Sequence, residues 1–171
     1  MSKRELSKYL TSLSKKELEA QVSELYDRLK EVRQFYNFVF NPKEDKMVEE
    51  AKFKISKEYF PPSGRKPKRR RSVAQKHLRD FIKLGVEPGL IADVMLYNIE
   101  IAQAANAEKT INQDSFYKSI LNSFEEALQF LNQHNQQAKF KMRVEKIIDR
   151  VEEQHWINAQ AFSDMYEKHG I

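Results

Sequence analysis

The residues best suited to chemistry in this chain form a concentrated run of positive charge. Between Arg65 and Lys83 there are nine Lys and Arg residues and one acidic residue, Asp80, so this segment carries +8, whereas the rest of the chain carries −3. Such asymmetry is typical of contact with a polyanion. The candidate nucleic-acid or anion-binding residues are Arg65, Lys66, Lys68, Arg69, Arg70, Arg71, Lys76, Arg79 and Lys83.

Three interpretations of the basic run remain open. It binds the phosphates of RNA or DNA, it docks on an acidic protein surface or a second subunit, or it is a solvated linker. Phosphate contacts release counterions and give affinity that falls steeply with salt. Tyr59 and Phe60 lie close enough in sequence to offer a stacking surface, although a core position at a helix end is the simpler expectation.

No other constellation predicts a specific reaction. Glu152 and His155 have the spacing used by di-iron bundles, but the second Glu-x-x-His that such sites need is missing. The chain has no cysteine and neither common phosphate-binding glycine loop. We therefore expect no metal, no cofactor and no catalytic residue, and a binding protein is favoured over an enzyme. Asn98 lies on an apolar helical stripe, where packing is favoured over a polar ligand cavity against the next helix.

The elements that must position these residues are all helical in pattern. Ser2 with Glu5 and Ser14 with Glu17 form two capping boxes. From Lys15 to Phe40 one helix is expected, and its apolar seam of Leu18, Val22, Leu25, Leu29, Val32, Tyr36 and Val39 follows a heptad spacing. That helix either packs on two neighbours or forms a homodimer through the Leu18–Val39 seam.

The rest of the chain continues as helices separated by short turns. A helix ending near Tyr59 is expected to form an antiparallel hairpin with residues 15–40, and further helices begin near Ser72 and Pro88. Pro67 and adjacent like charges disfavour helix between residues 63 and 71. Lys76, Arg79 and Lys83 then follow on one face of the next helix.

The predicted fold class is all-α, an irregular bundle of about eight helices, with a short helical-repeat array as the alternative. We expect one domain over residues 1–171. Within it, residues 1–62 hold a long helical hairpin, residues 63–71 a basic loop and mobile boundary, and residues 72–171 a unit of four to five helices.

Several longer stretches resemble a family of small bacterial proteins of unknown function. They are FNPKED (40–45), ISKEYFP (55–61), RRSVAQKHL (70–78), IADVMLYNIEIAQ (91–103), SFYKSILNSFEEALQF (115–130) and NAQAF (158–162). The resemblance covers nearly the whole chain. It implies a bacterial cytoplasmic protein and assigns no activity to any residue.

These observations predict a cytoplasmic, non-enzymatic binding protein. The N-terminus has no apolar signal segment, and no apolar run approaches the 18 residues of a membrane span. The expected partner is an anion, foremost nucleic acid, held by the basic loop. The alternative is a protein-interaction or assembly module, homodimeric through the Leu18–Val39 seam.

Overall fold

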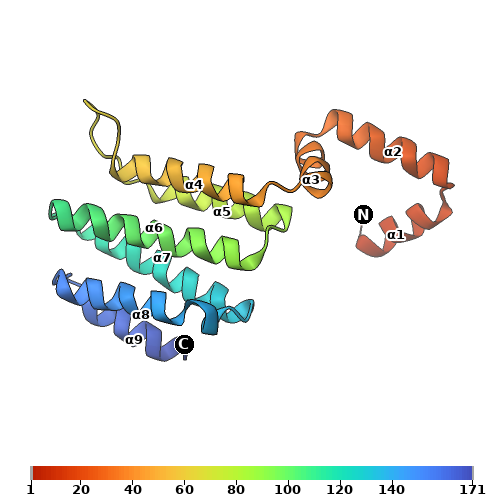
Figure 1. Cartoon of the computed structure of the whole chain (residues 1–171). Helices are drawn as coiled ribbons and strands as arrows, with labels where there is room; N and C mark the ends of the chain where they lie inside the picture. Colours follow the sequence, from red (N-terminus) through yellow and green to blue (C-terminus); the bar gives the residue numbers. More distant parts are fainter. Residues whose placement is uncertain (1, 171) are drawn as a thin grey trace. The chain divides into compact units, whose positions relative to one another are not determined.

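The computed structural model describes residues 2–170 and confirms an all-α fold. Helices make up 79% of the described residues, and no strand occurs among them (Figure 1). None of the described helices combines the length and apolar character needed to cross a bilayer. The nine helices within residues 2–170 are α1 (Lys3–Ser12), α2 (Lys15–Arg28), α3 (Lys30–Phe40), α4 (Glu44–Tyr59), α5 (Arg71–Leu84), α6 (Pro88–Glu108), α7 (Asp114–Gln133), α8 (Gln137–Glu153) and α9 (Ala159–His169).

The chain divides between Lys43 and Glu44 into two compact units, here called the N-terminal unit (residues 2–43) and the C-terminal unit (residues 44–170). In the N-terminal unit both predicted capping boxes are present. The Ser2 hydroxyl accepts from the backbone N–H of Glu5 at 3.3 Å, and the Glu5 carboxylate accepts from the Ser2 N–H at 2.6 Å. Ser14 and Glu17 repeat the arrangement at 3.3 and 2.7 Å.

The prediction of one helix from Lys15 to Phe40 is wrong, because the helix breaks at Leu29. The backbone there is extended, with φ −113° and ψ 116°. The Arg33 guanidinium stabilises the break by donating to the carbonyl oxygens of Tyr26 and Asp27 at 3.3 and 2.8 Å. These carbonyls lie in the last turn of α2, where no helical N–H reaches them. The heptad seam is therefore divided between α2 and α3.

The C-terminal unit is organised around α6, which packs against α4, α5, α7 and α8 (Figure 1). Twelve of its 21 residues are buried, as expected of a helix that is apolar around most of its circumference. The sequence predicts its start correctly. Pro88 occupies the first turn, and the Glu87 carboxylate accepts from the Leu90 N–H at 2.9 Å.

Helix α4 belongs to the C-terminal unit because its apolar side is covered there. Val48, Ala51, Ile55 and Tyr59 are buried, and α4 packs against α5 and α6. The sequence pattern places the join between helical halves at residues 63–71 and pairs α4 with residues 15–40. In the structure the compact units divide at Lys43, so the basic loop connects two helices of one unit.

An ionic network ties α4, α6 and α8 together inside the C-terminal unit. Lys52 on α4 lies 2.5 Å from the Asp93 carboxylate on α6. Arg143 on α8 lies 2.6 Å from Asp93 and 2.6 Å from Glu100. These side chains are about three-quarters buried, so their charges are screened less than those of surface pairs. The network fixes α4, the helix that leads into the basic loop.

Candidate anion-binding site

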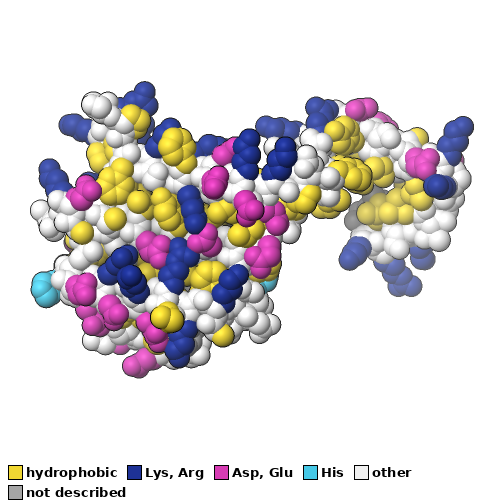
Figure 2. All heavy atoms as spheres, in the orientation of Figure 1, with side chains coloured by type: hydrophobic (Ala, Val, Ile, Leu, Met, Phe, Trp, Pro, Cys, Tyr) yellow, Lys and Arg dark blue, Asp and Glu magenta, His cyan; other side chains and the backbone are white. Residues whose placement is uncertain are grey.

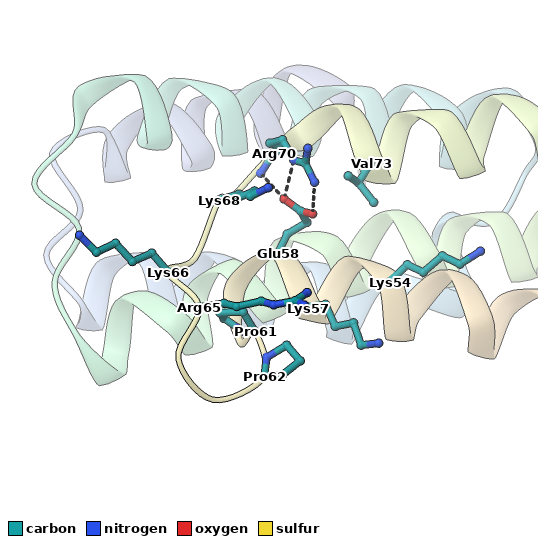
Figure 3. Close-up of a pocket in the computed structure, with 10 residues that line it drawn as sticks. All are labelled: Lys54, Lys57, Glu58, Pro61, Pro62, Arg65, Lys66, Lys68, Arg70 and Val73. Atoms are coloured by element: carbon teal, nitrogen blue, oxygen red, sulfur yellow. Dashed lines mark hydrogen bonds and ion pairs between the residues drawn. The ribbon is translucent and has the colours of Figure 1, made fainter.

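A hollow of about 380 Å³ lies where the end of α4, the basic loop and the start of α5 meet (Figure 3). We call it the cationic pocket. Six of the ten residues that surround it are basic and one is acidic, so its lining carries a net charge of +5. The lining residues are Lys54, Lys57, Glu58, Pro61, Pro62, Arg65, Lys66, Lys68, Arg70 and Val73.

Glu58, in the last turn of α4, holds the returning end of the loop. Its backbone carbonyl accepts from the N–H groups of Lys68 and Arg69 at 3.1 and 2.9 Å. Its carboxylate accepts from the backbone N–H of Arg70 at 3.3 Å and from the Arg70 guanidinium at 2.9 and 2.7 Å. Residues 60–70 are irregular, as the sequence predicts, but their far end is tied to α4 rather than loose.

The same contacts set the charge state of Glu58. Hydrogen bonds from the Arg70 side chain lower the pKa of the Glu58 carboxyl below its ordinary value, and they outweigh burial, which raises it. Glu58 is therefore a carboxylate at neutral pH, and its one negative charge is matched by Arg70. The positive charges that remain around the pocket belong to other side chains.

Five basic side chains of the cationic pocket have no carboxylate partner within the part of the chain that the structure describes. Over residues 2–170, no carboxylate oxygen lies within 4.0 Å of their charged nitrogens. They are Lys54, Lys57, Arg65, Lys66 and Lys68. All five are exposed. Figure 3 shows Arg70 turned onto Glu58, while Lys66 extends away from the other labelled side chains. Such a group can surround an anion from several directions.

Arg71, the sixth predicted loop residue, is engaged elsewhere. It is the first residue of α5 and lies 2.6 Å from the Glu126 carboxylate on α7, and its Nε donates to the Ser123 hydroxyl at 2.9 Å. The helix thus starts one residue before the predicted Ser72. Arg69 does not line the pocket. It is half-buried and has a left-handed backbone with φ 52°.

The predicted basic face of α5 lies apart from the cationic pocket. Arg79 borders a different, largely apolar hollow of about 350 Å³ together with Met95 on α6 and Phe130 on α7. Lys76 and Lys83 are exposed and line neither hollow. The cationic pocket therefore brings together four of the nine predicted residues: Arg65, Lys66, Lys68 and Arg70.

Three charged residues of the site were not predicted as site residues: Lys54, Lys57 and Glu58 on α4. A sequence signal was present, because Lys54 and Lys57 lie three apart, on one side of the helix that runs directly into the basic loop. The Lys57 amino group also lies 4.0 Å from the centre of the Phe53 ring, a cation–π contact that leaves the charge accessible.

The aromatic residues at the end of α4 offer no base-stacking surface in the pocket. Tyr59 is 4% exposed, and burial raises its pKa to about 12. Neither Tyr59 nor Phe60 lines the pocket, and the ten lining residues include no aromatic side chain. The core position considered for Tyr59 is therefore confirmed. The chemistry available at the site is charge–charge attraction and N–H donation to oxyanions.

Other candidate chemistry is not assembled in the described structure. Asn98 is 4% exposed on α6 and lines neither hollow. Over residues 2–170, no group of three or more His, Asp or Glu side chains is placed to hold a metal ion. The cationic pocket is the strongest candidate site because it joins charge, shape and accessibility.

Comparison with known proteins gives a family and no activity. A family model described as a family of unknown function (DUF6155) matches residues 1–170. No curated protein matches the chain, and no solved structure matches it.

Proposed function

The chain belongs to the DUF6155 family of unknown function, and from that premise we propose that it is a binding protein whose cationic pocket holds the phosphates of a nucleic acid. The observation that carries the proposal is a group of five basic side chains around one hollow that have no carboxylate partner among residues 2–170. Two of them come from α4 and three from the loop.

The tethered loop favours a binding role over a plain linker. A solvated linker needs no internal partner, whereas here Glu58 accepts from three successive residues, Lys68, Arg69 and Arg70. This holds the preceding basic residues next to α4. Charges that are already positioned lose less conformational freedom when an anion binds, so they contribute more of their attraction to affinity.

The proposed recognition is of the backbone and is independent of base sequence. The lining has lysine and arginine side chains for phosphate and no aromatic side chain for stacking on bases. Such binding depends steeply on salt. With five phosphate contacts, the logarithm of the binding constant on duplex DNA falls with a slope of about −4.5 against the logarithm of salt.

The direct test is fluorescence anisotropy of the full chain with generic single- and double-stranded RNA and DNA. We expect the affinity to fall about two to three orders of magnitude between about 50 and about 200 mM salt. A variant with Arg65, Lys66 and Lys68 changed to Ser should bind weakly and with a flatter salt dependence.

The matched control is a variant with Lys118, Lys141 and Lys146 changed to Ser. These lysines are exposed and lie outside the pocket, so the control also loses three positive charges but keeps the pocket intact. It should retain most of the affinity. Absence of binding at 50 mM salt, or equal losses in the two variants, contradicts the proposal.

A second candidate function, a protein-assembly module, is favoured by a separate observation on the N-terminal unit. That observation concerns apolar surface rather than charge.

A further inference from the structure

The N-terminal unit has no buried residue among residues 2–43, although many of its residues are apolar. Figure 2 shows hydrophobic side chains gathered on its visible face. Nine large apolar side chains are between 38% and 80% exposed. They form what we call the N-terminal apolar face: Leu6, Tyr9, Leu10, Val22, Leu25, Leu29, Phe35, Val39 and Phe40.

A unit of this size without a core needs support from another source. Domains near 40 residues generally depend on disulfides, metals or oligomerisation. The chain has no cysteine, and the described residues hold no metal-binding group. The contacts between its helices include a hydrogen bond from the Tyr26 hydroxyl to the Asn37 side chain at 3.1 Å and a pair of aromatic rings, Tyr26 and Tyr36. The missing stabilisation must come from covering the apolar face.

We infer that the N-terminal apolar face is covered by the same face of a second copy, so that the chain is a homodimer through α1–α3. The area agrees with a stable interface. Nine side chains of this kind, about half exposed, present roughly 700 Å². That approaches the about 800 Å² that each partner buries in a standard interface.

The charges of α2 are mixed along its length rather than separated by sign. The helix carries four acidic and three basic residues. Lys15 pairs with Glu19 at 3.7 Å, and Arg28 pairs with Glu24 at 2.6 Å, both within the helix. A surface with so little net charge does not repel its own copy when one patch is used twice about a two-fold axis.

The shape of the face also suits insertion of a partner's side chain. A hollow of about 420 Å³ lies between α2 and α3, bordered by Val22, Tyr26, Tyr36 and Phe40 together with two polar residues. Phe40 is 80% exposed at its rim. The break at Leu29 creates this hollow between the two helices, where a continuous helix would leave only a narrow seam.

The dimer also has a consequence for anion binding, which rests on the proposed function. Two chains carry two cationic pockets, and two linked sites bind one polyanion more tightly than either alone when its length allows both to engage. The test below contains no nucleic acid, so its outcome is separate from that of the anion-binding experiment.

The mass of the full chain in solution is the first measurement. Light scattering coupled to size exclusion at about 50 μM protein should give twice the 20.3 kDa chain mass. The variant Val22→Glu/Leu25→Glu should be monomeric with unchanged helical circular dichroism. The control Met142→Glu/Ile157→Glu changes two more exposed apolar residues, outside the N-terminal unit, and should remain dimeric. A monomeric wild-type chain overturns the inference, as does a Val22→Glu/Leu25→Glu variant that stays dimeric.

Because the chain has no cysteine, single-cysteine variants give a second readout that does not depend on tolerance of charge. Val22 lies at the middle of α2, so a two-fold antiparallel pairing brings the two copies of this position together. Val22→Cys should form an intermolecular disulfide under mild oxidation, whereas Met142→Cys should not. If the Val22→Glu/Leu25→Glu variant loses its helical signal, the cross-linking experiment is the test of the dimer. Equal cross-linking at both positions overturns the inference.

Discussion

Two guanidinium nitrogens of Arg70 donate to the two carboxylate oxygens of Glu58 at 2.9 and 2.7 Å, across twelve residues of sequence. Forked pairs of this kind fix orientation as well as distance. The Glu58 side chain is 11% exposed, whereas that of Arg70 is 54% exposed. The pair therefore anchors the end of the basic loop on the wall of the cationic pocket and removes Arg70 from the charges available to an anion.

Glu58→Gln should loosen the loop and lower stability by about 1–2 kcal/mol at pH 7, because the charge-assisted bonds to Arg70 are lost while Arg70 stays partly solvated. The pKa of Glu58 is lowered in the folded protein. The contribution of ionised Glu58 to the free energy of unfolding is therefore complete at a pH above its ordinary pKa, near 4.5. It is lost as the pH falls through the lowered pKa of the folded protein. Urea unfolding of both proteins at pH 7 and pH 3 measures this. If the wild type and the variant differ in unfolding free energy as much at pH 3 as at pH 7, the prediction is wrong.

Lys54→Ser/Lys57→Ser should weaken nucleic-acid binding and reduce the salt slope by about 1.8 on duplex DNA, since two phosphate contacts are removed. The matched control is Lys76→Ser/Lys83→Ser, which removes two charges from α5 outside the pocket. Its slope should change much less. Anisotropy titrations across four salt concentrations give the slopes. A larger change in the α5 variant places the binding surface on α5 instead.

Arg71→Gln should lower stability without altering anion binding, because Arg71 contacts Glu126 and Ser123 on α7 rather than the pocket. We expect a loss of about 1 kcal/mol, which corresponds to a fall of about 2–4 °C in Tm for a chain of this length. Differential scanning calorimetry and a binding titration check the two statements together. A several-fold loss of affinity with unchanged Tm would contradict this prediction and would show that Arg71 binds the anion.

Arg143→Met should lower the free energy of unfolding by about 3 kcal/mol. It leaves two carboxylates, Asp93 and Glu100, partly buried, and of these only Asp93 keeps a cationic partner, Lys52. Burial raises the pKa of Asp93, but hydrogen bonds from Lys52 and Arg143 outweigh it and keep the pKa low. The network therefore stabilises at neutral pH and weakens in acid.

A double-mutant cycle isolates the Arg143 interaction. Glu100→Gln combined with Arg143→Met should cost less than the sum of the single changes, since the orphaned carboxylate is then neutral. Additive losses in chemical denaturation would show that Glu100 is not coupled to Arg143, and would leave the cost of Arg143→Met to its other contacts, including Asp93.

The sequence by itself determined the features that depend on near neighbours. Ser2–Glu5 and Ser14–Glu17 form capping boxes because both partners lie within one helical turn. Pro88 begins α6 because its fixed backbone angle suits a first turn. Pro67 and adjacent like charges keep residues 60–70 irregular. The all-α class follows from the same local rules, repeated along the chain.

Tertiary structure decided which charges act together. Lys54 and Lys57 join the pocket because α4 packs on α5 and α6, a grouping that the apolar pattern does not specify uniquely. Arg71 turns to Glu126, 55 residues away, and Arg33 reaches back to end α2 at Leu29. A long side chain can reach several partners with similar energy. The packed backbone selects one of them, and sequence spacing does not encode that choice.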